Sequence, residues 1–159
     1  MEHSIIYFGF HHIRCIMILK QLIKRTTNNT NEGTLCVAES CTPEIPFEIK
    51  RVYYTYGVKR GITRGHHAHR KLEQILICPH GKIEITLDYG NNYTESVILD
   101  DPAKGLYVGP STWRTMKWLQ DDSVLLVLAS EHYDETDYIR NYEDFIKWIH
   151  QGENNADTI

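Results

Sequence analysis

The sequence predicts an all-β fold, an antiparallel sandwich or barrel, followed by a C-terminal helix. From residue 51 onward the apolar residues come in short runs rich in β-branched and aromatic members, and each run has the length of a strand. Turn-forming residues separate the runs at fairly regular intervals, at 79–81, 89–92, 100–105 and 120–122. Many short strands at such spacing favour antiparallel sheets over alternating β–α units, whereas the tail has a helical pattern.

Length and composition fit one globular domain. The chain has 159 residues, of which 42% are hydrophobic and 24% charged, which is enough for a single substantial core. The formal net charge of −4 gives no general attraction to nucleic acid or to an anionic membrane, so we expect neither as a partner. The cysteines at positions 15, 36, 41 and 78 form no CxxC pair, which favours free thiols in a reducing cytoplasm.

The N-terminal region is expected to lie outside the domain. The expected partition is an extension at residues 1–25, one domain at 26–152 that includes the C-terminal helix, and a tail at 153–159. The apolar stretch at 4–19 contains His11, His12 and Arg14, so it suits neither a signal peptide nor a membrane span of ~20 apolar residues. Met17 offers an alternative start, with the residues before it lying upstream.

Loops precede and separate the expected strands. TTNNTNEG (26–33) is rich in turn formers, and TPEIPFEIK (42–50) carries two prolines that favour extended or turn conformations. The expected strands are RVYYTYGV at 51–58, EQILICP at 73–79, KIEITLDYG at 82–90, ESVILDD at 95–101, GLYVGP at 105–110 and SVLLVLAS at 123–130.

The tail at 134–152, DETDYIRNYEDFIKWIHQG, predicts an amphipathic helix. Its apolar stripe at helical spacing consists of Tyr138, Tyr142, Phe145, Ile146 and Ile149. An acidic start, a basic finish and Gly152 beyond it suit the helix dipole and a glycine stop. This stripe is expected to pack against the barrel or against a partner subunit.

The segment RGHHAHRKLEQ at 64–74 concentrates groups that can carry chemistry. Residues two apart on a strand share a face, so His67 and His69 project together while His66 faces away toward the surface. A histidine pair beside Arg64 is hard to explain as core filling, because buried cationic groups need partners. Imidazole binds transition metals and also transfers protons near neutral pH, so these residues alone allow a metal site or an acid-base site.

The longer segment GITRGHHAHRKLEQILICPHG (61–81) resembles the first motif of the cupin family. The matching positions are Gly61, His67, His69, Gln74 and Gly81. Metal-binding cupins carry a glutamate ligand where this chain has Gln74, and a further histidine where the segment 105–116 has Arg114 or Thr115. Because two imidazoles make a poor zinc or iron site, we expect no metal and no cofactor.

Further segments narrow the resemblance to the bacterial nucleotide-sugar 3,4-ketoisomerases of the cupin class. They are FEIKRVYYTY (47–56), RGHHAHRKLEQ (64–74), GLYVGPSTWRTM (105–116) and VLASEHYDETDYIRNYEDF (127–145), and the match covers roughly residues 31–150. The resemblance implies a cupin jelly-roll β-barrel with a C-terminal helix, and a homodimer. The related sugar 3,5-epimerases share the fold and similar proton chemistry, which makes them the nearest alternative.

The resemblance implies an isomerase that converts dTDP-4-keto-6-deoxy-D-glucose into its 3-keto isomer through an enediol, without a redox cofactor. His67 would be the principal base that moves the proton between carbons, with His69 and Tyr53 handling the hydroxyl and carbonyl protons. The product would lead to a 3-amino-3,6-dideoxyhexose for surface polysaccharide. A base with a pKa near neutrality suits removal of the acidic proton next to a ketone.

The substrate-binding residues that the resemblance implies are Arg64, Gln74, Arg70, Lys71, Tyr107 and Arg114. An arginine presents a fixed fork of donors to an enediolate or a diphosphate, which suits Arg64. Two departures from relatives, Arg114 in place of a histidine and Asn-Glu-Gly at 31–33, concern product configuration, and Arg114 favours a gluco-type product. A metal-dependent cupin and a non-catalytic sugar-binding cupin remain as alternatives.

Overall fold

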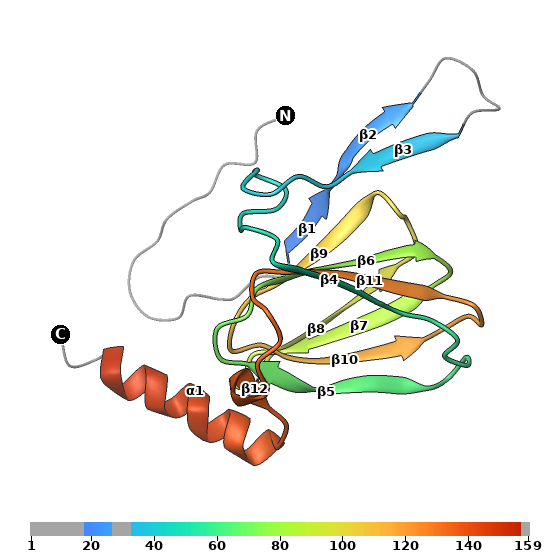
Figure 1. Cartoon of the computed structure of the whole chain (residues 1–159). Helices are drawn as coiled ribbons and strands as arrows, with labels where there is room; N and C mark the ends of the chain where they lie inside the picture. Colours follow the sequence, from blue (N-terminus) through green and yellow to red (C-terminus); the bar gives the residue numbers. More distant parts are fainter. Residues whose placement is uncertain (1–17, 27–32, 157–159) are drawn as a thin grey trace.

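Two antiparallel sheets form the body of this computed structural model, which describes residues 18–26 and 33–156 (Figure 1). The strands of the first sheet, in spatial order, are β1 (Ile18–Gln21), β9 (Lys104–Val108), β6 (Gln74–His80), β11 (Val124–Ala129) and β4 (Arg51–Thr55). Those of the second are β12 (Tyr138–Ile139), β5 (Thr63–His69), β10 (Trp113–Trp118), β7 (Ile83–Asp88) and β8 (Thr94–Leu99). The predicted all-β jelly-roll fold is confirmed, and each of the expected strands overlaps an observed one.

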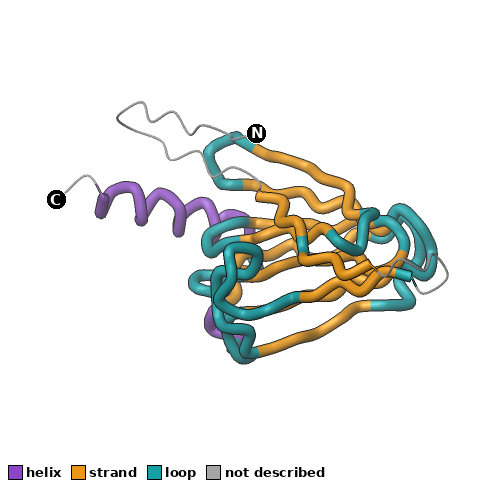
Figure 2. Tube along the Cα trace, turned by 90° about the horizontal axis from the view of Figure 1, so that it is seen from above, coloured by secondary structure: helices purple, strands orange, loops and turns teal. Residues whose placement is uncertain are grey.

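The core lies between the sheets because inward-facing apolar residues alternate with outward-facing ones. In β7, Ile83, Ile85 and Leu87 are buried and the residues between them are not, as period-2 alternation requires. They pack with Trp118, which is fully buried. Seen from above, the strands lie in layers and the C-terminal helix projects to one side (Figure 2).

A β-bulge interrupts the pairing of β5 with β10. Arg114 lies opposite His67, but Thr115 lies opposite Gly65, so His66 is the extra residue. Gly65 and His66 both have positive φ, 94° and 54°, and a Cβ on Gly65 would lie 2.8 Å from the Arg114 backbone oxygen. Such bulges redirect side chains on either side of them. Here the extra residue brings Arg64 to the same face as His67, although positions three apart normally face opposite ways.

The C-terminal segment differs from the prediction at both ends, because the helix begins later than expected and continues past the expected stop at Gly152. The helix α1 spans Tyr142–Ala156, and Tyr138 belongs instead to β12, which pairs with β5. Asp134 accepts a hydrogen bond from the Thr136 backbone and begins the 3-10 turn η1 (Glu135–Asp137), after which the chain is extended. Placing Tyr138 on the helical stripe was therefore wrong, because a capped turn and a sheet edge precede the helix.

The rest of the helical stripe packs against the barrel, as expected. Phe145 is completely buried against Trp113 and Ile139, and Ile146 and Ile149 pack at the edge of the same cluster. This contact holds the helix beside β12 and β5 (Figure 1).

Near the N-terminus, β1 hydrogen-bonds to β9, and β2 (Ile23–Thr26) pairs with β3 (Thr34–Val37). β1 lies within the segment 1–25 that was expected to be an extension, while residues 1–17 and 27–32 lie outside the described residues. The alternative start at Met17 and the loop positions Asn31 and Glu32 fall on that undescribed part. Across the described residues, no helix has the length and apolar character needed to cross a membrane.

Candidate active site

A cavity of about 250 Å³ lies between the two sheets and is called the inner cavity here. Its walls come from β4, β5, β6, β10 and β11, together with two residues of the segment after η1. Its lining residues are Tyr53, Thr55, Arg64, Gly65, His67, Gln74, Leu76, Arg114, Met116, Trp118, Leu125, Val127, Tyr138 and Arg140. Polar and charged side chains form most of its wall, beside apolar residues such as Leu76, Trp118 and Val127, and converging polar groups of this kind are typical of a small-molecule site.

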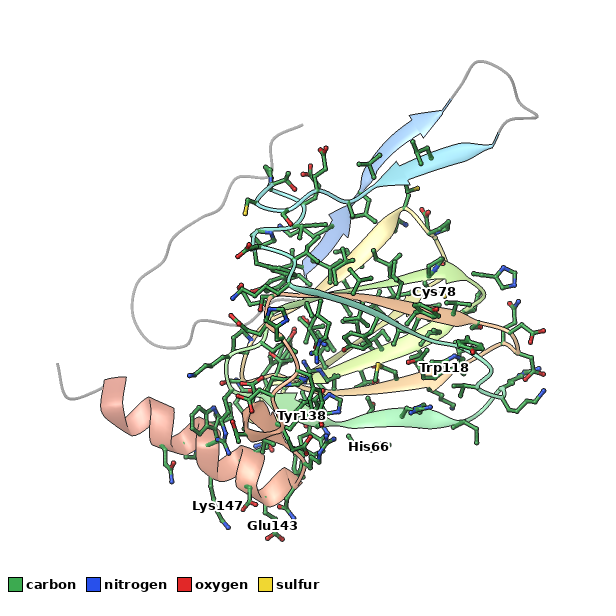
Figure 3. The ribbon with its side chains drawn as sticks, in the orientation of Figure 1. His66, Cys78, Trp118, Tyr138, Glu143 and Lys147 are labelled. Atoms are coloured by element: carbon green, nitrogen blue, oxygen red, sulfur yellow. The ribbon has the colours of Figure 1, made fainter. Side chains whose placement is uncertain are left out.

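His67 is a neutral base within this cavity. Burial, followed by the positive charge of Arg114, lowers the pKa of its imidazole from 6.5 to about 4. At neutral pH the ring therefore holds an unshared pair that can accept a proton. His66, by contrast, is exposed on the outer side of β5 (Figure 3), as its predicted surface role requires.

His69 is almost fully buried and is held by a carboxylate. Its Nδ1 lies 2.9 Å from Oδ2 of Asp137, whose Oδ1 accepts the backbone N–H of Lys71 at 2.8 Å. Burial and the charge of Arg114 lower the pKa of His69, so the ring is neutral and Nδ1–H donates to Asp137. The opposite nitrogen, Nε2, is buried and has no hydrogen-bond partner among the described residues.

Three side chains cross the cavity from one sheet to the other. Arg114 of β10 donates a short hydrogen bond to Oε1 of Gln74 in β6, and the Gln74 amide nitrogen lies 2.6 Å from the hydroxyl of Tyr53 in β4. Arg114 is 1% exposed, yet none of the ion pairs among the described residues includes it. Burial lowers the pKa of its guanidinium to about 10, so it remains a cation at neutral pH.

Tyr138 and Arg140 are cavity residues that the sequence did not identify. The Tyr138 ring lies 4.2 Å from that of His69 and 5.2 Å from that of His67, centroid to centroid, and Arg140 stacks on it at 4.2 Å. Figure 3 shows Tyr138 beside β12, between the helix and the barrel. The helical pattern of the tail obscured both residues and Asp137. The capping sequence from Asp134 to Thr136 was the available signal that the helix begins later.

The implied site residues divide between two cavities. The inner cavity brings together Tyr53, Arg64, His67, Gln74 and Arg114. A second, outer cavity of about 500 Å³ is lined by His69, Arg70 and Lys71 and shares Tyr138 with the first. Arg70 stacks on Trp148 at 4.5 Å.

Tyr107 does not reach either of these cavities. Its side chain packs against an apolar cluster that includes Ile45, Phe47 and Ile75, and its hydroxyl donates a hydrogen bond of 3.0 Å to Glu73. It lies between Leu106 and Val108, which are both buried in the core. Strand alternation therefore turns Tyr107 to the other face of β9.

The donor set does not suit a metal ion. Nδ1 of His69 is turned to Asp137, and Oε1 of Gln74 is occupied by the Arg114 guanidinium, whose charge opposes a cation there. Among residues 18–26 and 33–156, no three His, Cys, Asp or Glu side chains are grouped as ligands would be.

Comparison with known proteins gives a consistent picture. The family described as "FdtA: WxcM-like, C-terminal" matches residues 17–150. A protein of Aneurinibacillus thermoaerophilus named TDP-4-oxo-6-deoxy-alpha-D-glucose-3,4-oxoisomerase is 50% identical over 119 residues, which make up 75% of this chain and 84% of that protein.

Solved structures agree with this match. QdtA, a sugar 3,4-ketoisomerase from Thermoanaerobacterium thermosaccharolyticum in complex with TDP, is 42% identical with a TM-score of 0.80, covering 87% of this chain and 98% of its own. WlaRB, a TDP-quinovose 3,4-ketoisomerase from Campylobacter jejuni, is 41% identical with a TM-score of 0.76, covering 85% and 99%. The RmlC epimerase of Mycobacterium tuberculosis, at 16% identity, TM-score 0.64 and coverage of 80% and 70%, shares the fold alone.

Proposed function

The chain belongs to the FdtA family of WxcM-like C-terminal proteins, and on that premise we propose that it is a nucleotide-sugar 3,4-ketoisomerase. Its substrate is TDP-4-keto-6-deoxy-D-glucose and its product a TDP-linked 3-keto-6-deoxyhexose. The product carries a ketone at C3, the position at which an aminotransferase would form a 3-amino-3,6-dideoxyhexose for a surface polysaccharide. The relatives named as 3,4-ketoisomerases over nearly their whole length support this assignment.

The reaction needs a proton to leave C3 and a proton to reach C4, while the hydroxyl proton moves from O3 to O4. His67 is the base that takes the C3 proton and returns it to C4, because it is neutral and lines the inner cavity. Arg114 stabilises the negative charge of the enediolate from within a site of low dielectric constant. Tyr53 transfers the oxygen protons, and His69 supports His67 with its ring 5.0 Å away.

The diphosphate must lie outside the inner cavity, which is of the size of a sugar rather than of a whole nucleotide sugar. Arg64 lies at the exposed part of the cavity wall and is assigned to the phosphates, with Arg70 and Lys71 near the outer cavity as further cations. Gln74 and Arg114 line the cavity that would hold the sugar, and Arg114 favours the gluco-type product.

The acting unit is proposed to be a homodimer. Ile18 and Leu19 on the edge strand β1, and Val52 and Tyr54 on the edge strand β4, are exposed, and exposed apolar sheet edges favour pairing with another chain.

The cysteines Cys36, Cys41 and Cys78 are free thiols, as suits a reducing cytoplasm.

The observation that carries the proposal is a neutral His67 in the wall of the inner cavity, paired with the buried Arg114 cation on the neighbouring strand β10. The test is NMR spectroscopy of TDP-4-keto-6-deoxyglucose with the enzyme in deuterated buffer. A 3-keto product is expected, and an unchanged sugar without deuterium at C3 or C4 would refute the proposal. Inversion at C3 and C5 without ketone migration would identify a 3,5-epimerase instead.

A matched variant tests the base. His67→Asn is expected to lower kcat by ~10²-fold or more, as loss of a positioned acid-base group typically does. Binding of TDP, measured by calorimetry, should persist, because in the proposed arrangement the nucleotide does not contact His67. His66→Asn, on the exposed side of the same strand, serves as the control.

A further inference from the structure

Gln74 is a buried side chain that the proposed reaction leaves without a chemical task of its own. It is 2% exposed and sits at the start of β6, between the Arg114 guanidinium and the Tyr53 hydroxyl. A carboxamide has one acceptor end and one donor end, so its orientation decides what each neighbour can do.

Arg114 fixes that orientation. A guanidinium has only donors, so the Gln74 atom that faces it must be the carbonyl oxygen. The amide NH₂ must then face Tyr53, and since NH₂ can only donate, the Tyr53 oxygen accepts this hydrogen bond. The phenolic proton of Tyr53 is not used in this hydrogen bond. Among the described residues the Tyr53 hydroxyl makes no other hydrogen bond, so it can donate its proton to a ligand in the cavity.

We propose that Gln74 is a positioning residue that holds Tyr53 as a hydrogen-bond donor toward the sugar. Arg114 sets the direction of the hydrogen bonds that run from Arg114 through Gln74 to Tyr53. The inference rests on the proposed function and deepens it. It also explains why an amide suits this position better than a carboxylate. A glutamate would accept from Arg114 and from Tyr53 alike, which would turn the phenolic proton away from the cavity.

Tyr53 alone can then account for the movement of the hydroxyl proton from O3 to O4. As His67 removes the C3 proton, Tyr53 donates its proton to O4, where the charge of the enediolate develops. The resulting phenolate is stabilised by the Gln74 N–H and, through the amide, by Arg114. It takes the proton of the O3 hydroxyl while His67 returns the carbon proton to C4, and Tyr53 ends as it began.

The resting state agrees with this role. Burial raises the pKa of the Tyr53 phenol, against the opposing effects of Arg114 and the Gln74 hydrogen bond. Tyr53 is therefore protonated before turnover and can donate.

The test compares Gln74→Glu, Tyr53→Phe and the double variant. Gln74→Glu is expected to lower kcat by about 10²-fold while KM changes by no more than about threefold, because a proton-transfer step is lost and not sugar binding. In the double variant the losses should not multiply, because both substitutions disable the same proton donor. A Gln74→Glu enzyme with normal kcat, or losses that multiply in the double variant, would overturn the proposal.

Two controls separate this inference from other effects. Gln151→Glu adds the same charge on the exposed helix and should leave kcat unchanged. A titration of ¹³Cζ-labelled tyrosine, with Tyr53→Phe for assignment, needs no turnover. The pKa of Tyr53 should rise in Gln74→Glu, because a carboxylate retains the phenolic proton. An unchanged pKa would contradict the proposed direction of the hydrogen bonds. A wild-type enzyme without isomerase activity would refute the proposed function, while this titration would still decide the orientation of Gln74.

Discussion

At the scale of single residues, the environment of each titratable group sets its chemistry. Arg114 is buried and takes part in none of the ion pairs between described residues, and its charge acts on both histidines and on the Gln74 amide. A cation placed in this way keeps His67 neutral and available as a base. Asp137 does for His69 what Arg114 does for Gln74, because it fixes which end of the ring carries the proton.

Asp137→Asn tests that tautomer. Because the Lys71 backbone N–H donates to this side chain, the asparagine oxygen would remain there and its NH₂ would face His69. Nδ1 must then accept, and the proton moves to Nε2. We expect kcat to fall by about tenfold or more, as loss of a partner that orients a histidine typically does, and ¹⁵N NMR should report the changed tautomer. Asp144→Asn on the exposed helix is the control, and an unchanged His69 tautomer would contradict the assignment.

At the scale of elements, two irregularities assemble the site. The bulge at Gly65 and His66 gives Arg64 and His67 a common face, and the turn η1 followed by β12 brings Asp137 and Tyr138 against β5. Both interrupt a regular pattern at the point where side chains must converge. Bulges beside active sites commonly have this effect.

Gly65→Ala probes the bulge. The added methyl would lie 2.8 Å from the Arg114 carbonyl oxygen at a φ of 94°, a conformation that a residue with a Cβ resists. We expect a loss of about 1–3 kcal/mol in the free energy of unfolding, measured with denaturant. kcat should fall more than it does in Gly57→Ala, which also has positive φ but meets no neighbouring atom within 4 Å. Equal effects of the two variants would show that the bulge does not position the site.

At the scale of the whole molecule, burying two histidines links stability to pH. The folded-state pKa of His67 is about 4 and that of His69 is also lowered, whereas an unfolded chain keeps the ordinary value of 6.5. Between pH 6.5 and 4 the unfolded state binds more protons, so stability is present above pH 6.5 and declines as the pH falls through this window.

This linkage can be measured as the denaturant midpoint against pH. The decline from pH 6.5 to 4 should be shallower in His67→Asn than in the wild type, because one group that resists protonation is gone. His66→Asn is the matched control, since its side chain is exposed and asparagine tolerates its positive φ of 54°. Parallel curves for all three proteins would contradict the burial of a neutral His67.

Much of this protein follows from local sequence. Period-2 alternation placed the strands, as in Ile83, Ile85 and Leu87, and the side-by-side projection of His67 and His69 followed from their spacing. The histidine segment together with the segments at 47–56, 105–116 and 127–145 also indicated the family, which the comparisons confirm. Helical spacing identified Phe145 and Ile149 as packing residues. These features depend on neighbours close in sequence, and a single chain reports them.

Tertiary structure decided the rest. The sequence alone could not indicate that Gln74 would meet Arg114, forty residues later, or that Tyr138 would leave the helix and cover the histidines. The first contact joins strands of opposite sheets and the second joins β12 to β5, which are distant in sequence, and a bulge of one residue reverses every side chain beyond it. The residue types of the site could therefore be read from the chain. The direction of each hydrogen bond, and with it the role of each group, was decided only by the folded barrel. There, burial and the charge of Arg114 together lower the pKa values of His67 and His69.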